Sequence, residues 1–110
     1  MHIDKKKKYT LVRFDKNTFS EFYNSFLNEE KKHQKENIII EVSNNINISN
    51  KEFLLFLNIA QQKKKNGTSF VIVYTNINVD DFPEDFNIAP TLQEAEDVID
   101  MENMERELGF

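Results

Sequence analysis

The amino-acid sequence contains no cysteine, and it has only two glycines and two prolines among 110 residues. The lack of cysteine excludes disulfides, thiolate metal ligands and cysteine nucleophiles together. So few glycines and prolines argue against a loop-rich or disordered chain. No run of about 18 apolar residues occurs, and no apolar stretch follows the basic start as it would in a signal peptide. We therefore expect a cytoplasmic protein with no membrane partner.

Charge is distributed unevenly along the chain, whose net charge is −5. Residues 1–36 carry nine basic and six acidic side chains, whereas residues 80–110 carry one basic side chain and eleven acidic ones. An acidic segment of this kind repels phosphate backbones and anionic lipid heads. We therefore expect no nucleic-acid partner. The run Lys5-Lys6-Lys7-Lys8 either contacts RNA or lipid or, as we favour, forms a solvated hairpin turn that protects the edge of a sheet.

Hydrophobic patterning predicts an alternation of strands and helices. The predicted strands cover residues 9–14, 38–42 and 70–74, with short partner strands at 1–4 and 88–89. The predicted helices cover residues 18–32, 53–65 and 91–108, and residues 76–86 are expected to form a loop or one short helical turn. Buried strands that alternate with helices indicate an α/β fold: a mixed sheet of four to five strands with helices packed on it. We expect a single domain over residues 1–110.

Each predicted helix begins with a Ser or Thr that stands three residues before a Glu, which is the pattern of a capping box. The three pairs are Thr18 with Glu21, Ser49 with Glu52, and Thr91 with Glu94. In the helix after Ser49, the neighbours Leu54 and Leu55 are too many for one buried face, so we expect one or both in a contact patch. In the last helix we expect an inner face formed by Leu92, Ala95, Val98, Ile99 and either Met101 or Met104.

This order of elements, together with particular segments, resembles the STAS family, the sulphate transporter and anti-sigma factor antagonist domain. The resemblance is carried by residues 9–14, 37–43, 53–65, 66–73 and 87–95. The ending Met104-Glu105-Arg106-Glu107-Leu108-Gly109 is similar to that of small stand-alone members from the Bacteroidetes, especially flavobacteria. The resemblance implies a protein-binding regulator, with an anti-sigma factor or a kinase-like regulator as its partner.

The working part of that family is an Asp-Ser-Ser/Thr-Gly turn at the start of the second long helix, where a partner kinase phosphorylates a hydroxyl. The corresponding turn here is Ser49-Asn50-Lys51-Glu52, in which the serine position holds Asn50 or Lys51 and the glycine position holds Glu52. The resemblance therefore implies docking without the phosphorylatable serine. The expected partner-binding residues are Ser49, Asn50, Lys51, Glu52, Leu54 and Leu55. Ser49 is itself a candidate phosphosite, although a plain helix N-cap is the favoured interpretation.

No pattern in the sequence points to catalysis, a metal or a cofactor. His2 and His33 are the only histidines, and we expect His33 in a solvated helix end or loop without partners at metal-site spacing. The acidic run from Asp80 to Asp85 contains Pro83 and lacks the mid-loop glycine of a calcium loop, so we expect a solvated turn. Two isolated glycines cannot form a glycine-rich phosphate loop. We expect a protein that is not an enzyme and binds no cofactor.

Two functions remain open on these grounds. The first is a non-enzymatic regulator that docks on a protein through residues 44–58 and the acidic last helix. The second is a structural module that forms a homodimer and has no signalling role. The seven acidic residues of the last helix are expected on its outer faces, where they either meet a basic partner or keep the protein in solution. They are Glu94, Glu96, Asp97, Asp100, Glu102, Glu105 and Glu107.

Overall fold

A computed structural model describes residues 1–16 and 18–109 and contains a five-stranded sheet whose strands lie in chain order. The strands are β1 (His2–Lys5), β2 (Thr10–Phe14), β3 (Ile38–Val42), β4 (Phe70–Val73) and β5 (Ile88–Ala89). β1 runs antiparallel to β2, and the other neighbouring strands are parallel. The predicted α/β fold with a mixed sheet is confirmed, including the short strands at both edges.

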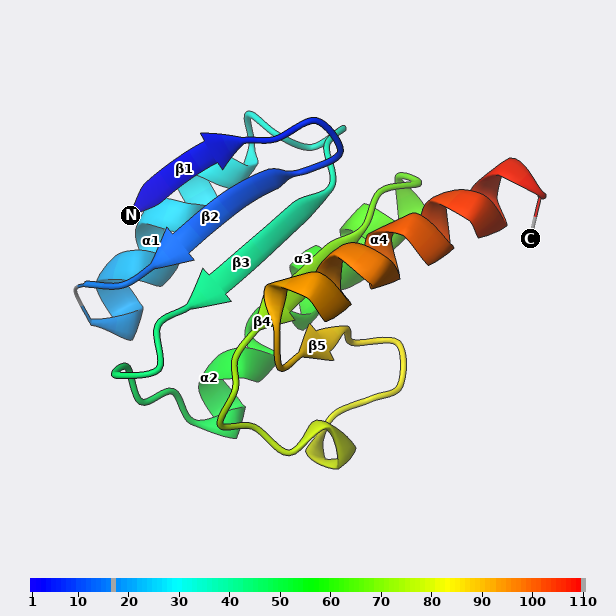
Figure 1. Ribbon diagram of the computed structural model, residues 1–110. Helices are drawn as coiled ribbons and strands as arrows, with labels where there is room; N and C mark the ends of the chain where they lie inside the picture. Colours follow the sequence, from blue (N-terminus) through cyan, green and yellow to red (C-terminus); the bar gives the residue numbers. More distant parts are fainter. Residues whose placement is uncertain (17, 110) are drawn as a thin grey trace.

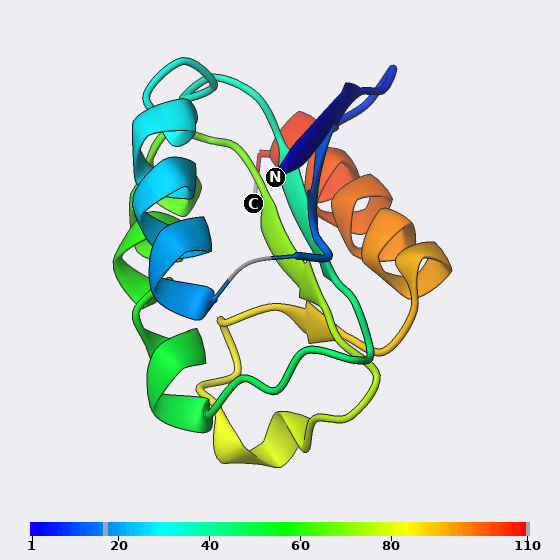
Figure 2. The ribbon, with the colours of Figure 1, turned by 90° about the vertical axis from the view of Figure 1, so that its left-hand side faces the viewer.

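Helices cover both faces of the sheet and give three layers (Figure 1). α1 (Phe19–Glu30), α2 (Asn50–Leu54) and α3 (Leu57–Lys65) lie on one face, and α4 (Leu92–Glu107) lies on the other (Figure 2). A 3-10 turn, η1 (Val79–Asp81), stands in the predicted loop. None of the helices in the described ranges combines the length and apolar character needed to cross a membrane.

The two faces of the sheet carry cores of different kinds. On the face of α1, α2 and α3 the core is aromatic: Phe14 stacks on Phe22 with ring centroids 4.2 Å apart, and Phe56 meets several further rings. On the face of α4 the core is smaller and largely aliphatic, built around Ile39 and Ile99. The alternation of side chains along each strand divides β-strand residues between these two cores.

The predicted helix starts are confirmed by the caps. Thr18 Oγ1 accepts a hydrogen bond from the backbone N–H of Glu21 at 3.2 Å, and Thr91 Oγ1 accepts one from Glu94 at 3.2 Å. Ser49 forms the complete capping box with Glu52. These side chains satisfy backbone donors that have no partner within the helix.

The predicted single helix over residues 53–65 is wrong, because the chain leaves the α-helical path at Leu55 and Phe56. The backbone N–H groups of both residues bond three residues back, to Glu52 and Phe53, before α3 begins at Leu57. Tyr23 of α1 donates its hydroxyl to the carbonyl oxygen of Leu55 at 3.1 Å, which gives that carbonyl a partner. A hydrogen bond from α1 therefore stabilises the break between α2 and α3.

Candidate protein-docking surface

The six residues predicted to bind a partner lie together on α2 and its two caps. Ser49 accepts from the backbone N–H of Glu52 at 3.2 Å, and the carboxylate of Glu52 accepts from the backbone N–H of Ser49 at 2.9 Å. Asn50 and Lys51, in the first turn, are exposed. The side chain of Glu52 is thus occupied in holding the start of the helix, while Asn50 and Lys51 face outward.

Leu54 and Leu55 are exposed side by side at the end of α2, with 38% and 50% of their surfaces accessible. The buried residues of this segment are Phe53 and Phe56, which the tight turn places on the same side, toward the aromatic core. Residues between two such anchors must point away from the sheet. The prediction that the pair contributes to an exposed apolar surface agrees with this geometry.

The segment before α2 is held in place by hydrogen bonds to its backbone and side chains. Tyr74, at the end of β4, donates its hydroxyl to the carbonyl oxygen of Ile46 at 2.6 Å, and Ser43 bonds the side chain of Asn45. Asn50 Nδ2 donates to Asp81 Oδ2 at 3.1 Å and so joins α2 to η1. The same turn exposes a further apolar side chain, Val79. The hydrogen bonds from Tyr74 and Asn50 therefore hold the segments that flank the docking surface in place.

At Ser49 the geometry describes a capped helix start and places a carboxylate beside the hydroxyl. Ser49 Oγ lies 3.2 Å from Glu52 Oε1, to which it donates. A phosphate on this hydroxyl would lose the cap and meet a like charge, which is unfavourable. The arrangement favours the N-cap interpretation of Ser49 over the phosphosite.

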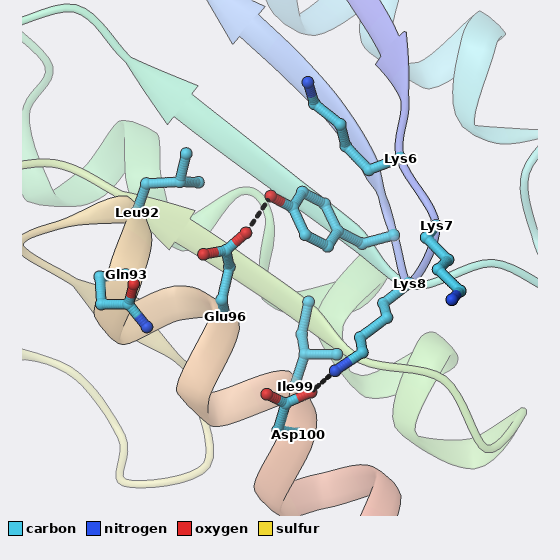
Figure 3. Close-up of a pocket in the computed structure, with 9 residues that line it drawn as sticks. Lys6, Lys7, Lys8, Leu92, Gln93, Glu96, Ile99 and Asp100 are labelled. Carbon is cyan, nitrogen blue, oxygen red and sulfur yellow. Dashed lines mark hydrogen bonds and ion pairs between the residues drawn. The ribbon is translucent and has the colours of Figure 1, made fainter.

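A hollow with a volume of about 500 Å³ lies elsewhere, between the β1–β2 turn and α4 (Figure 3). Lys8 Nζ donates to Asp100 across it at 2.9 Å, and the hydroxyl of Tyr9 donates to Glu96 at 2.6 Å. Burial, and then the bond to Glu96, raise the pKa of the Tyr9 hydroxyl well above its ordinary value. Tyr9 is therefore a neutral hydrogen-bond donor that anchors α4, and nothing in this arrangement prepares it as a nucleophile or base.

The acidic last helix differs from the prediction in two respects. Glu96 and Glu102 do not lie on its outer faces: Glu96 accepts from Tyr9, and Glu102 accepts from Ser69 at 2.6 Å and from Asn87 at 3.0 Å. Met101 and Met104, one of which was predicted to lie on the buried inner face, are both exposed. Hydrogen-bond donors on neighbouring elements hold the two carboxylates on the inner side of α4. The spacing of residues within the helix does not reveal these donors.

The solvated environment predicted for His33 is wrong, because most of its ring is covered. Only 17% of its side chain is exposed, and its two nitrogens face Glu36 at 2.8 Å and Glu29 at 3.2 Å. The bond with His33 is the main cause that lowers the pKa of Glu29 below its ordinary value. Over residues 1–16 and 18–109, no group of three or more His, Cys, Asp or Glu side chains is arranged to hold a metal ion.

Lys63, in the last turn of α3, is a buried cation. Its Nζ donates to the carbonyl oxygens of His33 at 2.9 Å and Glu36 at 2.7 Å. Burial lowers the pKa of Lys63, and the negative charges of Glu30 and Glu36 oppose that shift. A signal in the sequence was its spacing, four residues after Ile59 and three after Ala60, which are also buried.

No protein-family model and no curated protein sequence matches this chain.

Proposed function

We propose that this protein is a cytoplasmic, non-enzymatic regulator that binds another protein through the α2 surface, formed by Asn50, Lys51, Leu54 and Leu55. The observation that carries the proposal is the exposure of two adjacent leucines on a short helix that is fixed at both ends. Apolar side chains held in a rigid position bind at a low entropic cost, since little order has to be created on association. Aliphatic anchors with a charge beside them are a common form of protein interface.

The resemblance to STAS domains supports the same surface and suggests the kind of partner, an anti-sigma factor or a kinase-like regulator. In that family the start of the second long helix meets the partner, and here that position is the start of α2. Either Asn50 or Lys51 stands where the family carries its phosphorylated residue. We therefore propose constitutive docking, in which Lys51 meets an acidic group of the partner instead of responding to a phosphate.

The test is capture of crosslinked partners from the host with the tagged protein and its Leu54→Asp and Lys51→Glu variants, followed by mass spectrometry. We expect one regulator to be enriched with the wild-type chain and lost with Leu54→Asp, because a buried charge in an apolar contact is strongly unfavourable. Lys51→Glu is expected to weaken capture by charge repulsion. Gln61→Asp, on the exposed side of α3, is the matched control and should retain the partner.

Circular dichroism of each variant must match that of the wild type, so that a lost complex reports the surface and not the fold. Enrichment of the same partner by both α2 variants would show that this surface is not the docking site.

A second candidate, a structural homodimer, is favoured by the exposed leucines together with β1, which forms an open edge of the sheet. An edge strand presents unpaired backbone groups that a second copy can use. Sedimentation at low micromolar concentration separates the two candidates. A dimer that Leu54→Asp dissociates would support assembly, whereas a monomer leaves the α2 surface available for a different protein.

A further inference from the structure

The outward face of α4 carries apolar side chains in the spacing of a coiled-coil seam. Glu94, Asp97, Met101, Met104 and Leu108 follow one another at intervals of three, four, three and four residues. Of these, Met101, Met104 and Leu108 are 55%, 60% and 65% exposed, so the apolar part of the seam is the last two turns of the helix. Side chains in this alternation form one stripe along a helix.

Contacts on the inner side fix the rotation of α4 and keep that stripe turned away from the sheet. Ala95 and Ile99 are buried against the strands. Beyond them Glu102 bonds Ser69, and Arg106 donates to the Ser69 hydroxyl at 3.0 Å. The last turns of α4 extend beyond the strands of the sheet (Figure 1). The three apolar side chains therefore cannot be covered by a small rotation of the helix.

The residues that flank the seam are acidic. With Met101 and Leu108 at position a and Met104 at position d, the e and g positions over these turns hold Asp100, Glu105 and Glu107. Asp100 is paired with Lys8, while Glu105 and Glu107 are exposed. Between Leu92 and Glu107 the helix has seven acidic residues and one basic residue. Both flanks of the stripe thus carry negative charge.

This charge pattern decides which occupant fits. A second copy of α4, parallel or antiparallel, would place acidic e and g residues opposite acidic residues, and like charges at these positions select against pairing. A helix with Lys or Arg at e and g would meet opposite charges on both flanks. Methionine side chains are flexible and polarisable, so they adapt to the apolar side chains of a partner helix.

We propose that the α4 stripe (Met101, Met104 and Leu108) binds a helix of another protein that has apolar residues at a and d and basic residues at e and g. The stripe lies on the opposite face of the sheet from the α2 surface. The protein therefore has a second docking site, which does not depend on the function proposed for α2. Occupation of both sites would let this small domain bridge two proteins.

The test uses the full chain and a fluorescein-labelled synthetic peptide of about three heptads, with Leu at a and d and Lys at e and g. Fluorescence anisotropy measures its Kd. We expect Met101→Ser/Met104→Ser to raise Kd about tenfold or more, a loss of about 1.4 kcal/mol or more, because both apolar contacts at the centre of the proposed interface are removed together. Val79→Ser is the matched control, since it removes an exposed apolar side chain of η1, outside both proposed docking surfaces, and should leave Kd unchanged.

Two further peptides separate seam recognition from simple charge attraction. A peptide with Glu at e and g should not bind, and a peptide that keeps the lysines but has Ser at a and d should bind at least about tenfold more weakly. Equal binding of the Ser peptide, or no effect of the methionine substitutions, would overturn the proposal, because only ionic attraction would then be present. A dimer of the chain alone that Met101→Ser/Met104→Ser dissociates would overturn it too, in favour of self-association.

Two variants distinguish peptide binding to the α4 stripe from partner capture through the α2 surface. Leu54→Asp is expected to lose the captured regulator and to keep the peptide, while Met101→Ser/Met104→Ser is expected to do the reverse.

Discussion

Glu36 shows how one side chain can join segments that are distant in the sequence. Its carboxylate accepts from Thr10 Oγ1 at 2.6 Å and meets His33 Nδ1 at 2.8 Å, and Lys5 lies 3.6 Å away. These groups lower the pKa of Glu36 from 4.5 to about 2, with the bond from Thr10 as the largest cause. The folded protein therefore holds this carboxylate ionised over a range in which the unfolded chain binds a proton.

The acid sensitivity of the protein should depend on this residue. Because the folded-state pKa of Glu36 is depressed, its contribution to stability is present above about pH 4.5 and is lost as the pH falls toward 2. Glu36→Gln should be less stable at neutral pH and should lose less further stability between these pH values. Chemical denaturation across the range measures this, with Glu84→Gln, an exposed carboxylate, as the control. Identical pH profiles for Glu36→Gln and the wild type would contradict the assignment.

At the scale of elements, Lys63 attaches α3 to the connection between α1 and β3. Its ammonium group donates to two backbone carbonyls of that connection, His33 and Glu36. Buried acceptors that lose their donor cost about 1–3 kcal/mol, because they were taken out of water. This side chain thus ties the connection, which lies between the end of α1 and the start of β3, to α3.

Lys63→Met keeps the length and packing of the side chain and removes its donors. We expect it to lower the free energy of unfolding by about 1–3 kcal/mol, as measured by urea denaturation. Lys64→Met is the matched control, because Lys64 follows directly in the chain and is exposed, and its effect should stay within about 0.5 kcal/mol. Equal stabilities of the two variants would show that the carbonyls are satisfied without Lys63.

At the scale of the whole molecule, the two faces of the sheet differ in how much they bury. The face of α1, α2 and α3 contains most of the phenylalanines, including Phe14, Phe22 and Phe56, whereas α4 contributes mainly Ala95 and Ile99 to its core. Aromatic side chains bury more apolar area than alanine or isoleucine and dominate core energetics. The layer formed by α4 is accordingly the weaker one.

Native-state hydrogen exchange should show that the α4 layer opens more readily than the inner strands of the sheet. Amides of β3 and β4, which lie inside the sheet, are expected to open only with global unfolding, while amides of residues 101–108 open locally at lower free energy. The Tyr9–Glu96 and Lys8–Asp100 contacts should give the first half of α4 intermediate protection. Equal protection throughout α4 and β3 would mean that the molecule opens as a single unit.

The architecture could be predicted from local patterns. Runs such as residues 38–42 and 70–73 can be buried on both sides only inside a sheet, and the Ser or Thr caps mark the helix starts because they act within one turn. The exposure of Leu54 and Leu55 could be predicted for a similar reason, since consecutive helical residues cannot all face one core. Order, class and helix starts therefore follow from interactions between residues that are close in the chain.

Only the tertiary structure decided the positions of side chains that bond groups on another helix or strand. Tyr23 of α1 stabilises the break between α2 and α3, Ser69 and Asn87 turn Glu102 inward, and the carbonyls of His33 and Glu36 bury Lys63. Met101 and Met104 are exposed because the inner contacts of Ala95, Ile99 and Glu102 turn the opposite face of α4 toward solvent. Periodicity says which side chains share a helical face, but only the packed fold determines which face is covered and which polar groups the covering surface offers.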